Sequence, residues 1–357
     1  MPESQTPSLA ALLPLKVSGR HYGDNLARLD LLFSSLLHFG TPDLLDELVI
    51  VCRADEAGLI GRHLSQWRDL PLRIVVEDEH FPAFRRFNRP WQVRPWQRQQ
   101  VIKLNSPALT SADFVLTLDP DVMAVKPLDR DLLVAGGRAI LEPEPRAVHR
   151  QWWLDSADLL DVDPGLDRHG MNVTPALLST AVLAELHRRL EETGGRPWMD
   201  VLLTSYCDWT EYTLYLLAAE RASLLARHHV FADDPDAPAH LHTDPATSIW
   251  DAASATQANV ERLFTADDPG LFAVVQSNTG LSASDVAAVA ARHFPVRSIT
   301  PETAPAAGGR SKLEERVTIA SRLAAQRVYR LRRRLRRRAR RGTRPLVQRP
   351  DPTHVRR

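Results

Sequence analysis

The first 76 residues alternate continuous apolar runs with amphipathic segments, and this order constrains the fold more than any other feature. Continuous apolar runs predict strands, and a 3.6-residue apolar period predicts helices between them. The expected order is a strand at 9–17, a helix at 25–39, a strand at 48–52, a helix at 55–67 and a strand at 72–76. Strands that are apolar throughout are buried on both faces, which indicates an α/β fold with a mainly parallel sheet flanked by helices. Ligands of such sheets bind beyond the carboxyl ends of the strands.

A further apolar run begins at Asp113 and ends in Asp119-Pro120-Asp121. Two carboxylates one residue apart at a strand end can hold a hard divalent cation, which in turn can hold a diphosphate. The alternative is an acidic turn without a ligand, because Asp and Pro are also ordinary turn residues. Neither a G-x-G-x-x-G loop nor a P-loop sequence occurs, which disfavours those two phosphate-binding motifs.

Residues 97–104 predict a helix that runs towards this strand and carries Arg98 and Lys103. Each is a candidate for reaching diphosphate oxygens; the alternative is a solvated charge on the helix face. Further along the chain, the pattern predicts strands at 139–141, 171–175 and 228–231 and helices at 150–160, 176–192 and 198–205.

Two later segments contain polar residues with two interpretations each. Asp208 and Glu211 stand three residues apart before an apolar helix, which is the spacing of a capping box, but a carboxylate there can also orient a sugar hydroxyl or accept its proton. His240 and His242 lie on one side of an extended segment. One of them is a candidate third metal ligand, and the alternative is an ordinary surface or packed side chain.

The charge distribution separates a body from a tail. Residues 310–357 contain 18 Lys or Arg and 3 acidic residues, which leaves 27 basic and 41 acidic residues upstream. We expect one domain over 1–297, a linker over 298–311 and a basic tail, helical or partly disordered, over 312–357. A basic amphipathic helix suits an anionic membrane surface; a solvated tail is the alternative. Nucleic acid is disfavoured because Tyr329 is the only aromatic residue there.

The chain contains no run of 18 apolar residues and no signal-peptide pattern at its start, so we expect a cytoplasmic protein, peripheral on the inner face of the membrane if the tail binds lipid. Cys52 and Cys207 lack metal-site spacing and are expected to be buried thiols rather than a disulfide framework or a zinc site.

Four segments in this order resemble GT-A-fold nucleotide-sugar glycosyltransferases, and more narrowly an uncharacterised bacterial family placed among them. The resemblance covers about residues 10–295. The four segments are Trp96–Leu104, Leu118–Val122 with the D-x-D pattern, Met171–Pro175 and Glu211–Tyr215. It implies a GT-A-like single domain that moves a sugar from a nucleoside-diphosphate donor to an acceptor, such as a cell-envelope component or polysaccharide.

By this resemblance, Asp119 and Asp121 bind Mn²⁺ or Mg²⁺ and through it the donor diphosphate. His242, or less favourably His240, matches the late histidine that completes the metal shell in many of these enzymes. Neutralising the charge on the departing nucleotide is the expected role of the metal.

The resemblance also implies roles for residues around the metal. Lys103 and Arg98 would assist the diphosphate, and Lys16 and Asp24 would lie near the nucleobase and ribose. Glu211, or alternatively Asp208, would be the acceptor-side carboxylate, with Glu211 as the base if the enzyme inverts; retaining members need no such base. Trp153 and Trp250 are candidate platforms for a sugar ring, although tryptophan is more often simply packed.

Two other functions compete with this interpretation. In a metal-dependent phosphoryl-transfer enzyme of the haloacid-dehalogenase type, Asp119 would be a nucleophile. That signature expects the motif on the first strand and Thr or Val two residues after the second Asp, where this chain has Met123. A catalytically inactive, transferase-like interaction module located by the basic tail is the non-enzymatic alternative.

Overall fold

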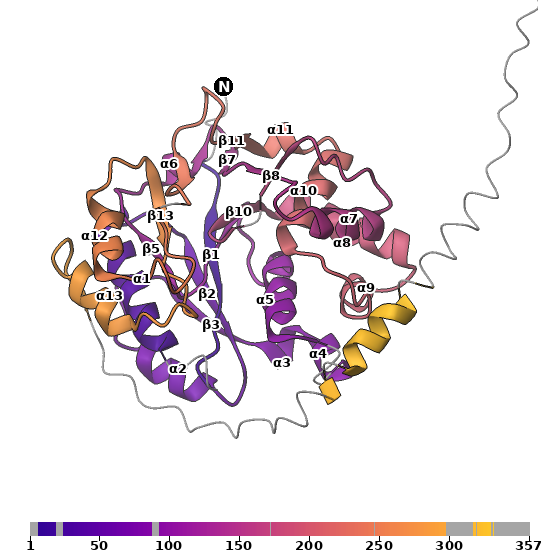
Figure 1. The fold of residues 1–357 in the computed structure, drawn as a ribbon, viewed down its shortest axis with the longest axis horizontal. Helices are drawn as coiled ribbons and strands as arrows, with labels where there is room; N and C mark the ends of the chain where they lie inside the picture. Colours follow the sequence, from indigo (N-terminus) through magenta and orange to yellow (C-terminus); the bar gives the residue numbers. More distant parts are fainter. Residues whose placement is uncertain are drawn as a thin grey trace, which may run out of the picture.

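The computed structural model describes residues 6–18, 24–87, 93–171, 173–245, 247–297, 317–318, 320–329 and 331. A five-stranded sheet forms the centre, in the order β10-β4-β1-β2-β3 (Figure 1). Its strands are β1 (Leu9–Pro14), β2 (Glu47–Cys52), β3 (Leu72–Val76), β4 (Phe114–Thr117) and β10 (Ala176–Ser179). The first four are mutually parallel and β10 is antiparallel to β4. The predicted mainly parallel sheet is therefore confirmed.

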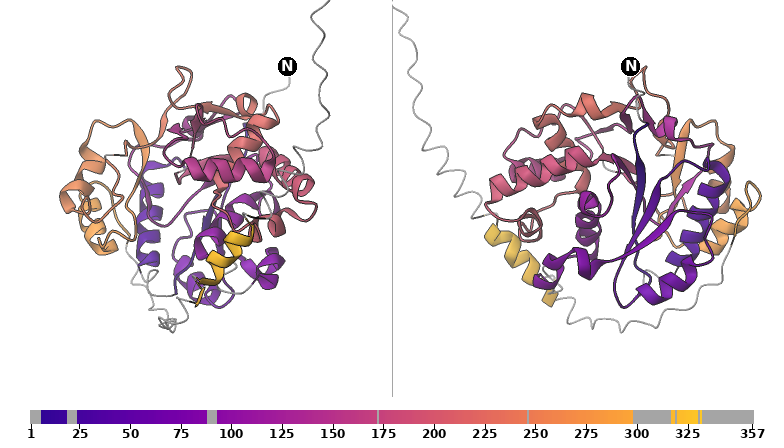
Figure 2. Two further views of the ribbon diagram at one scale, coloured as in Figure 1. Left: turned by 45° about the vertical axis from the view of Figure 1, so that its right-hand side comes forward. Right: turned by 180° about the vertical axis from the view of Figure 1, so that it is seen from behind.

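Helices cover both faces of this sheet, and Figure 2 shows the two layers from behind. Leu13, Ile50 and Leu116 point from the strands into a core shared with α1 (Asn25–Phe39) and α2 (Ala57–Leu64). Alternate residues of the same strands point into a second core on the opposite face. That core is shared with α5 (Pro95–Leu104), α7 (Arg150–Leu160), α8 (Thr180–Gly194), α9 (Trp198–Leu203) and α10 (Glu211–Arg221).

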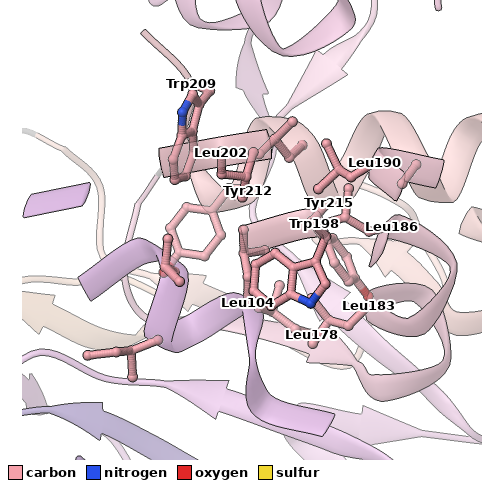
Figure 3. Close-up of a cluster of buried hydrophobic side chains, with 14 of the residues drawn as sticks. Leu104, Leu178, Leu183, Leu186, Leu190, Trp198, Leu202, Trp209, Tyr212 and Tyr215 are labelled. Atoms are coloured by element: carbon pink, nitrogen blue, oxygen red, sulfur yellow. The ribbon is translucent and has the colours of Figure 1, made fainter. Parts of the chain in front are cut away.

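The second core is dense in leucine and aromatic rings. Figure 3 shows Trp198, Trp209, Tyr212 and Tyr215 among leucines of α8, α9 and β10. All four aromatic side chains are buried. Each fully buried large side chain contributes on the order of 2 kcal/mol from removal of apolar surface from water. This packing fixes α10 and α5 over the end of β4.

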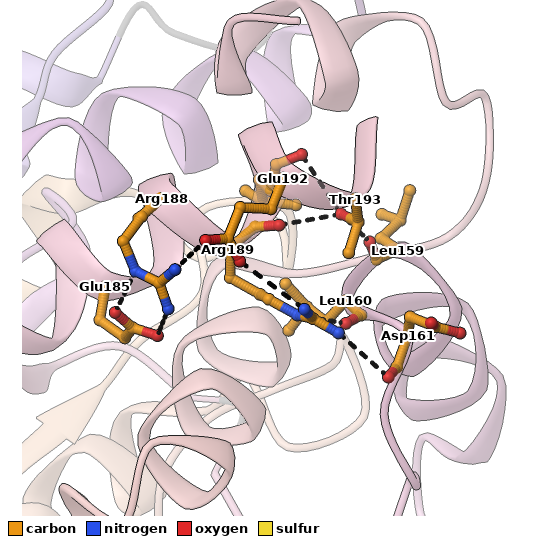
Figure 4. Close-up of polar contacts among 9 residues, drawn as sticks. Leu159, Leu160, Asp161, Glu185, Arg188, Arg189, Glu192 and Thr193 are labelled. Atoms are coloured by element: carbon orange, nitrogen blue, oxygen red, sulfur yellow. Dashed lines mark hydrogen bonds and ion pairs between the residues drawn. The ribbon is translucent and has the colours of Figure 1, made fainter. Parts of the chain in front are cut away.

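Polar contacts join the end of α7 to α8, as Figure 4 shows. Arg189 on α8 donates from Nε to the carbonyl of Leu160 at 2.8 Å, and the Thr193 hydroxyl donates to the carbonyl of Leu159 at 2.8 Å. The last carbonyls of a helix have no partner within it, so these side chains satisfy them. The contacts hold α7, which carries two neighbouring tryptophans, in register on α8.

A smaller sheet of order β12-β13-β5 lies beside α1 and is covered by α12 (Gln257–Thr265) and α13 (Ala283–Ala290). Its strands are β12 (His240–His242), β13 (Gly270–Val274) and β5 (Val122–Ala124). A Cβ at Gly270 would lie 2.2 Å from the Thr243 backbone nitrogen, so the close approach of β12 to β13 requires glycine. The segment 118–121 connects the central sheet to this smaller one.

The remaining elements are short and border the two sheets. They are α3 (Glu77–His80), α4 (Pro82–Arg86), η1 (Ser106–Ala108), α6 (Arg130–Leu133), β6 (Val134–Ala135), β7 (Arg138–Leu141), β8 (Glu144–Pro145), β9 (His169–Gly170), α11 (Leu225–His228) and β11 (His229–Phe231). Strands β11, β7 and β6 form a third sheet, with β7 beside β11.

One region differs from the sequence prediction. The expected strand 171–175 is not a strand in its described residues, and the expected helix over 176–192 begins only at Thr180. Residues Ala176–Ser179 instead pair antiparallel with β4, and all four are buried. A short apolar run fits either a strand or a buried helix. Here the run forms a strand, because it pairs with the edge of β4 that β1 does not occupy.

The expected linker over 298–311 lies outside the described residues, as does most of the expected tail. In the described tail segment, residues 320–329 are helical, and Figure 1 shows this segment near α4 and α9. Arg322 donates to Gln97 Oε1 at 3.1 Å, and Tyr329 packs against the second core. This part of the tail therefore contacts the body.

Two further expectations concern cysteines and membrane spans. Cys52 and Cys207 are free and buried, as predicted. In the part of the chain that the structure describes, every helix is too short or too polar to cross a bilayer.

Candidate active site

The Asp119-Pro120-Asp121 segment lies at the carboxyl end of β4, where the sequence places it. Its second half is held by the smaller sheet, since the Val275 N–H donates to the Asp121 carbonyl at 2.9 Å. The Ser277 N–H donates to Asp121 Oδ2 at 3.1 Å. The two carboxylates therefore lie in the segment that joins the two sheets, and both line one cavity.

Lys103 on α5 joins Asp119 to Glu211, the first residue of α10. Its Nζ lies 3.1 Å from Asp119 Oδ1 and 3.5 Å from Glu211 Oε1. The Lys103 side chain is 3% exposed, so its charge is nearly shielded from water. An ammonium group buried to this degree is stable only beside negative charge, and two carboxylates provide it.

The electrostatics of this cluster reflect both burial and mutual attraction. Burial opposes the charged form of Lys103, but the neighbouring groups, with Asp119 first and Tyr212 and Glu211 after it, together outweigh burial and raise the pKa of Lys103. Burial raises the pKa of Glu211 by more than Lys103 lowers it. Glu211 is thus a carboxyl group with an increased affinity for a proton, held beside a fixed cation.

A directed chain of hydrogen bonds leads from Lys103 into the sheet. Lys103 donates to Thr174 Oγ1 at 2.8 Å, and the Thr174 and Tyr212 hydroxyls lie 2.6 Å apart. Thr117 Oγ1 lies 2.8 Å from the Tyr212 hydroxyl and donates to the Ala176 carbonyl at 3.1 Å. Because Thr117 uses its proton on that carbonyl, Tyr212 donates to Thr117 and accepts from Thr174. Lys103 therefore has a fixed position as well as a fixed charge.

Asp121 lies in a different environment, without a lysine partner in the described contacts. Burial and the negative charge of Asp119 together raise the pKa of Asp121 to about 6. Arg28 on α1 supplies positive charge behind it while donating to the carbonyls of Val275 and Leu281 at 2.9 and 2.7 Å. A cation bound between Asp121 and Asp119 would be attracted by both negative charges.

Two carboxylates at this site, those of Asp119 and Asp121, could serve as protein ligands of a divalent cation. Among the described residues, no three His, Cys, Asp or Glu side chains are grouped so as to hold a metal. Asp119 Oδ1 is buried and has no hydrogen-bond donor, although it faces Lys103. A cation here would take its protein ligands from Asp119 and Asp121, and the others from diphosphate oxygens and water, which Mg²⁺ commonly retains.

A cavity of about 340 Å³ opens over this cluster. Its lining includes Trp96, Gln99, Gln100, Lys103, Asp119, Asp121, His149, Trp152, Val173, Thr174, Thr210, Glu211, Tyr212, Trp250, Val274 and Gln276. Four of these residues belong to α5, at positions i, i+3, i+4 and i+7: Trp96, Gln99, Gln100 and Lys103. This spacing places them on one face of the helix. That spacing in the sequence would have predicted Trp96 and the two glutamines, which we did not single out.

Arg98 lies away from this face. Its Nε is 2.7 Å from Glu77 Oε2, and its guanidinium lies 4.3 Å from the Phe84 ring centroid. Lys16 and Asp24 do not line this cavity either. They flank residues 19–23, which are outside the described part of the chain.

The structure separates the roles of Asp208 and Glu211. Of the two interpretations of Asp208 and Glu211, the capping box is wrong, because Thr210 is the N-cap of α10 and forms the box with Thr213. The Thr213 N–H donates to Thr210 Oγ1 at 3.1 Å, so the helix end needs neither carboxylate. Glu211 faces the cavity, whereas Asp208 is partly exposed and pairs with Arg94 at 3.6 Å.

The histidines of β12 line a second, neighbouring cavity rather than the one that holds Asp119 and Asp121. Burial lowers the pKa of His242 to about 4, although a hydrogen bond to the Pro175 carbonyl opposes the shift. His240 Nδ1 lies 3.1 Å from Glu142 Oε1. A metal-ligand role for His242 stays a prediction.

Aromatic rings border the first cavity. His149 stacks on Trp152 with ring centroids 4.0 Å apart, and Trp96 lies 5.8 Å from Trp152. Trp250 lines both cavities and therefore lies between them. Trp153, which the sequence suggested as a platform, is fully buried beneath the Arg146 guanidinium. Its neighbour Trp152 is half-buried and lines the cavity.

Comparisons with known proteins give one family match and several structural likenesses. Residues 6–298 match the model of a family described as a family of unknown function, DUF6492. A search of curated proteins found no match. Similar solved structures include the galactosyltransferase LgtC with donor and acceptor sugar analogues, at 12% identity, covering 81% of this chain and 97% of that chain, with a TM-score of 0.45.

Mouse xyloside xylosyltransferase 1 in its apo form is similar at 13% identity, covering 76% of this chain and 99% of that chain, with a TM-score of 0.43. Both of these proteins are sugar transferases.

Proposed function

The chain belongs to the DUF6492 family, and we propose that it is an enzyme that transfers a sugar from a nucleoside-diphosphate donor to an acceptor hydroxyl. The observation that carries this proposal is the convergence of Asp119, Asp121, Lys103 and Glu211 in one cavity. These residues come from the end of β4, from α5 and from α10. A metal and diphosphate site and an acceptor-side carboxylate both fit within this group.

Asp119 and Asp121 are proposed to hold Mn²⁺ or Mg²⁺. When bound, the cation would neutralise charge on the diphosphate as it departs from the sugar. Ser277 and Val275 would keep Asp121 in position through their backbone N–H groups. His242 is retained as a candidate third ligand, which would require its side chain to turn from the neighbouring cavity.

Lys103 is proposed to orient the two flanking carboxylates and to add positive charge beside the diphosphate. Its short contacts to Asp119 and Thr174 leave it little freedom to follow a ligand. Arg98 would have to leave Glu77 in order to assist a diphosphate. Lys16 and Asp24 are proposed to lie near the nucleobase and ribose, on the argument that the ends of neighbouring parallel strands meet at one edge.

Glu211 is proposed as the base of an inverting reaction. The acceptor oxygen would form a bond to the anomeric carbon, the bond from that carbon to the diphosphate oxygen would break, and the hydroxyl proton would pass to Glu211. Burial raises the pKa of Glu211, which makes its carboxylate a stronger base than an exposed one. Asp208 is the less favoured base because it pairs with Arg94 outside the cavity.

The basic tail is proposed to bring the enzyme to an anionic membrane surface, where a cell-envelope acceptor would be found. Val328 and Leu331 are 50% and 59% exposed in the described helical segment, and the sequence that follows is rich in arginine. Apolar residues beside arginine suit the boundary between lipid headgroups and acyl chains.

Thermal unfolding in the presence of nucleotides tests the proposal. We expect UDP, GDP, ADP or CDP to raise the melting temperature with Mn²⁺ and not without it. Asp121→Asn should abolish the increase, and Asp131→Asn, at an exposed carboxylate away from the cavity, should retain it. An unchanged melting temperature with all four nucleotides would exclude the transferase. Nucleotide binding without turnover of any donor would favour an inactive module, and hydrolysis of phosphate esters would favour the phosphoryl-transfer alternative.

A further inference from the structure

A second cavity of about 300 Å³ lies beside the candidate active site. That volume is at the lower end of the range of about 300–1,000 Å³ for small-molecule pockets. Val173 and Trp250 line both cavities, so they form the wall between them. Thr174, between Val173 and Pro175, contacts Lys103 on the active-site side, whereas Pro175 lines the second cavity.

The lining of this cavity is mainly apolar. Leu141, Met171, Ala176, Leu241 and Trp250 contribute to it, together with several prolines. Apolar walls favour a ligand group that loses contact with water on binding. The cavity therefore suits an alkyl or aromatic group better than a hydroxyl-rich sugar ring.

The charged groups of the lining are acidic. Glu142, Glu144, Asp244 and Asp268 contribute carboxylates, and no Lys or Arg occurs among the described lining residues. Two of these carboxylates accept hydrogen bonds from backbone N–H groups. Glu142 Oε2 accepts from the Leu241 N–H at 2.9 Å, and Asp268 accepts from the N–H groups of Asp244 and Gly270, each at 2.9 Å. Negative charge fixed in this way repels an anionic ligand.

We infer that this second cavity binds an uncharged apolar group of the acceptor, such as an alkyl or aromatic aglycone, while the acceptor hydroxyl lies at Glu211. The inference rests on the proposed function for the identity of the ligand as an acceptor. The bond that joins the apolar group to the hydroxyl-bearing part of the acceptor would pass the wall formed by Val173 and Trp250. A diphosphate or a lipid phosphate is excluded from the cavity by its carboxylates.

Isothermal titration with three probes on the full-length protein tests this inference. The probes are methyl β-D-glucoside, octyl β-D-glucoside below its micelle concentration, and octanoate. Each buried methylene group strengthens binding about fourfold, so octyl glucoside should bind at least tenfold more tightly than methyl glucoside. Octanoate, which has a similar chain and a negative charge, should bind at least tenfold more weakly than octyl glucoside.

Variants then locate the binding site. Pro269→Trp and Pro245→Trp each place a ring at an exposed lining position, and either should remove the advantage of the octyl chain. Pro235→Trp makes the same change at an exposed proline outside the cavity and should retain it. Melting temperatures would identify a variant that fails to fold, and the other lining variant then decides the result.

Several results would overturn the inference. These are equal affinity for methyl and octyl glucoside, octanoate binding as tight as octyl glucoside, and retention of the octyl advantage in both lining variants. Displacement of octyl glucoside by uridine, cytidine, adenosine or guanosine would assign the cavity to the nucleobase and also overturn it. These titrations contain no Mn²⁺ or nucleotide. The nucleotide-dependent melting experiment therefore tests the transferase proposal independently of the cavity, and its failure would exclude the transferase whatever the titrations show.

Discussion

Lys103 on α5 and Asp119 at the end of β4 form an ion pair, with Nζ 3.1 Å from Oδ1, beneath the candidate active site. The Lys103 side chain is 3% exposed, whereas the Asp119 side chain is 30% exposed and lines the cavity. The lysine therefore belongs to the protein interior, and the carboxylate faces the space where a ligand would bind. We therefore expect Lys103 to contribute to the stability of the fold as well as to the proposed site.

Lys103→Met should destabilise the protein by about 3 kcal/mol, because it leaves Glu211 and Asp119 without their buried counter-charge. Urea unfolding measures the change. Lys126→Met removes a lysine outside the cluster and should change the free energy of unfolding by about 0.5 kcal/mol or less. Equal stability of the Lys103→Met and Lys126→Met proteins would show that the ion pair contributes nothing.

Glu211→Gln should lower the rate of sugar transfer by about 100-fold or more if the enzyme inverts, since the amide cannot accept the hydroxyl proton. Nucleotide-dependent stabilisation should remain, because the Asp119–Asp121 carboxylates are intact. Asp208→Asn is the matched control and should keep the rate within about twofold, because Asp208 lies outside the cavity. Equal losses in both variants would argue against Glu211 as the base.

His229 should make stability depend on pH. Its Nε2 lies 2.6 Å from the Tyr215 hydroxyl and its Nδ1 lies 3.2 Å from the Ala139 carbonyl, and burial lowers its pKa to about 3. The folded state therefore binds fewer protons than the unfolded state between pH 3 and pH 6.5. The contribution of His229 to the free energy of unfolding is fully present above pH 6.5 and decreases as the pH falls. At pH 5 it has decreased by about 2 kcal/mol.

Urea unfolding at pH 7 and pH 5 measures this loss. In His229→Gln the difference between the two pH values should shrink by about 2 kcal/mol, although the variant is less stable at both. His38→Gln, at an exposed histidine, should retain the wild-type difference. An unchanged difference in His229→Gln would refute the assignment to this histidine.

Deletion of residues 332–357 should weaken binding to anionic vesicles without changing the melting temperature, because it removes 12 arginines and leaves the described helical segment. Deletion of 317–357 should also lower the melting temperature, because it removes Tyr329 from the second core and Arg322 from Gln97. Vesicle co-sedimentation and thermal unfolding measure the two effects, with neutral vesicles as the control. Equal anionic-vesicle binding by the full chain and both deletions would exclude the membrane role.

The sequence predicted the elements that depend on local patterns. The helices Asn25–Phe39 and Arg150–Leu160 and the strand Leu72–Val76 begin and end at the predicted residues. The antiparallel strand Ala176–Ser179 was predicted as helix, since four apolar or small residues do not distinguish the two periods. Pairing with an open sheet edge is a long-range event that a local pattern does not contain.

The same distinction applies to the candidate site. The D-x-D pattern and the apolar run before it were sufficient to place Asp119 and Asp121 at the end of a parallel strand. The sequence did not show which side chains face these carboxylates. Trp152 and Trp153 are an example, because adjacent residues point about 100° apart around a helix and the pattern does not indicate which one faces the site. In the structure Trp152 is half-buried and lines the cavity, whereas Trp153 is fully buried.

The sequence by itself determined that this chain forms a parallel α/β sheet with two carboxylates at its edge, because continuous apolar strands need cover on both faces and leave their polar ends outside. Only the tertiary structure decided that Lys103 and Glu211 meet Asp119, while Asp208, Arg98 and His242 face other partners. These residues are far apart in the chain, so their convergence depends on how α5, α10 and β12 pack around the sheet.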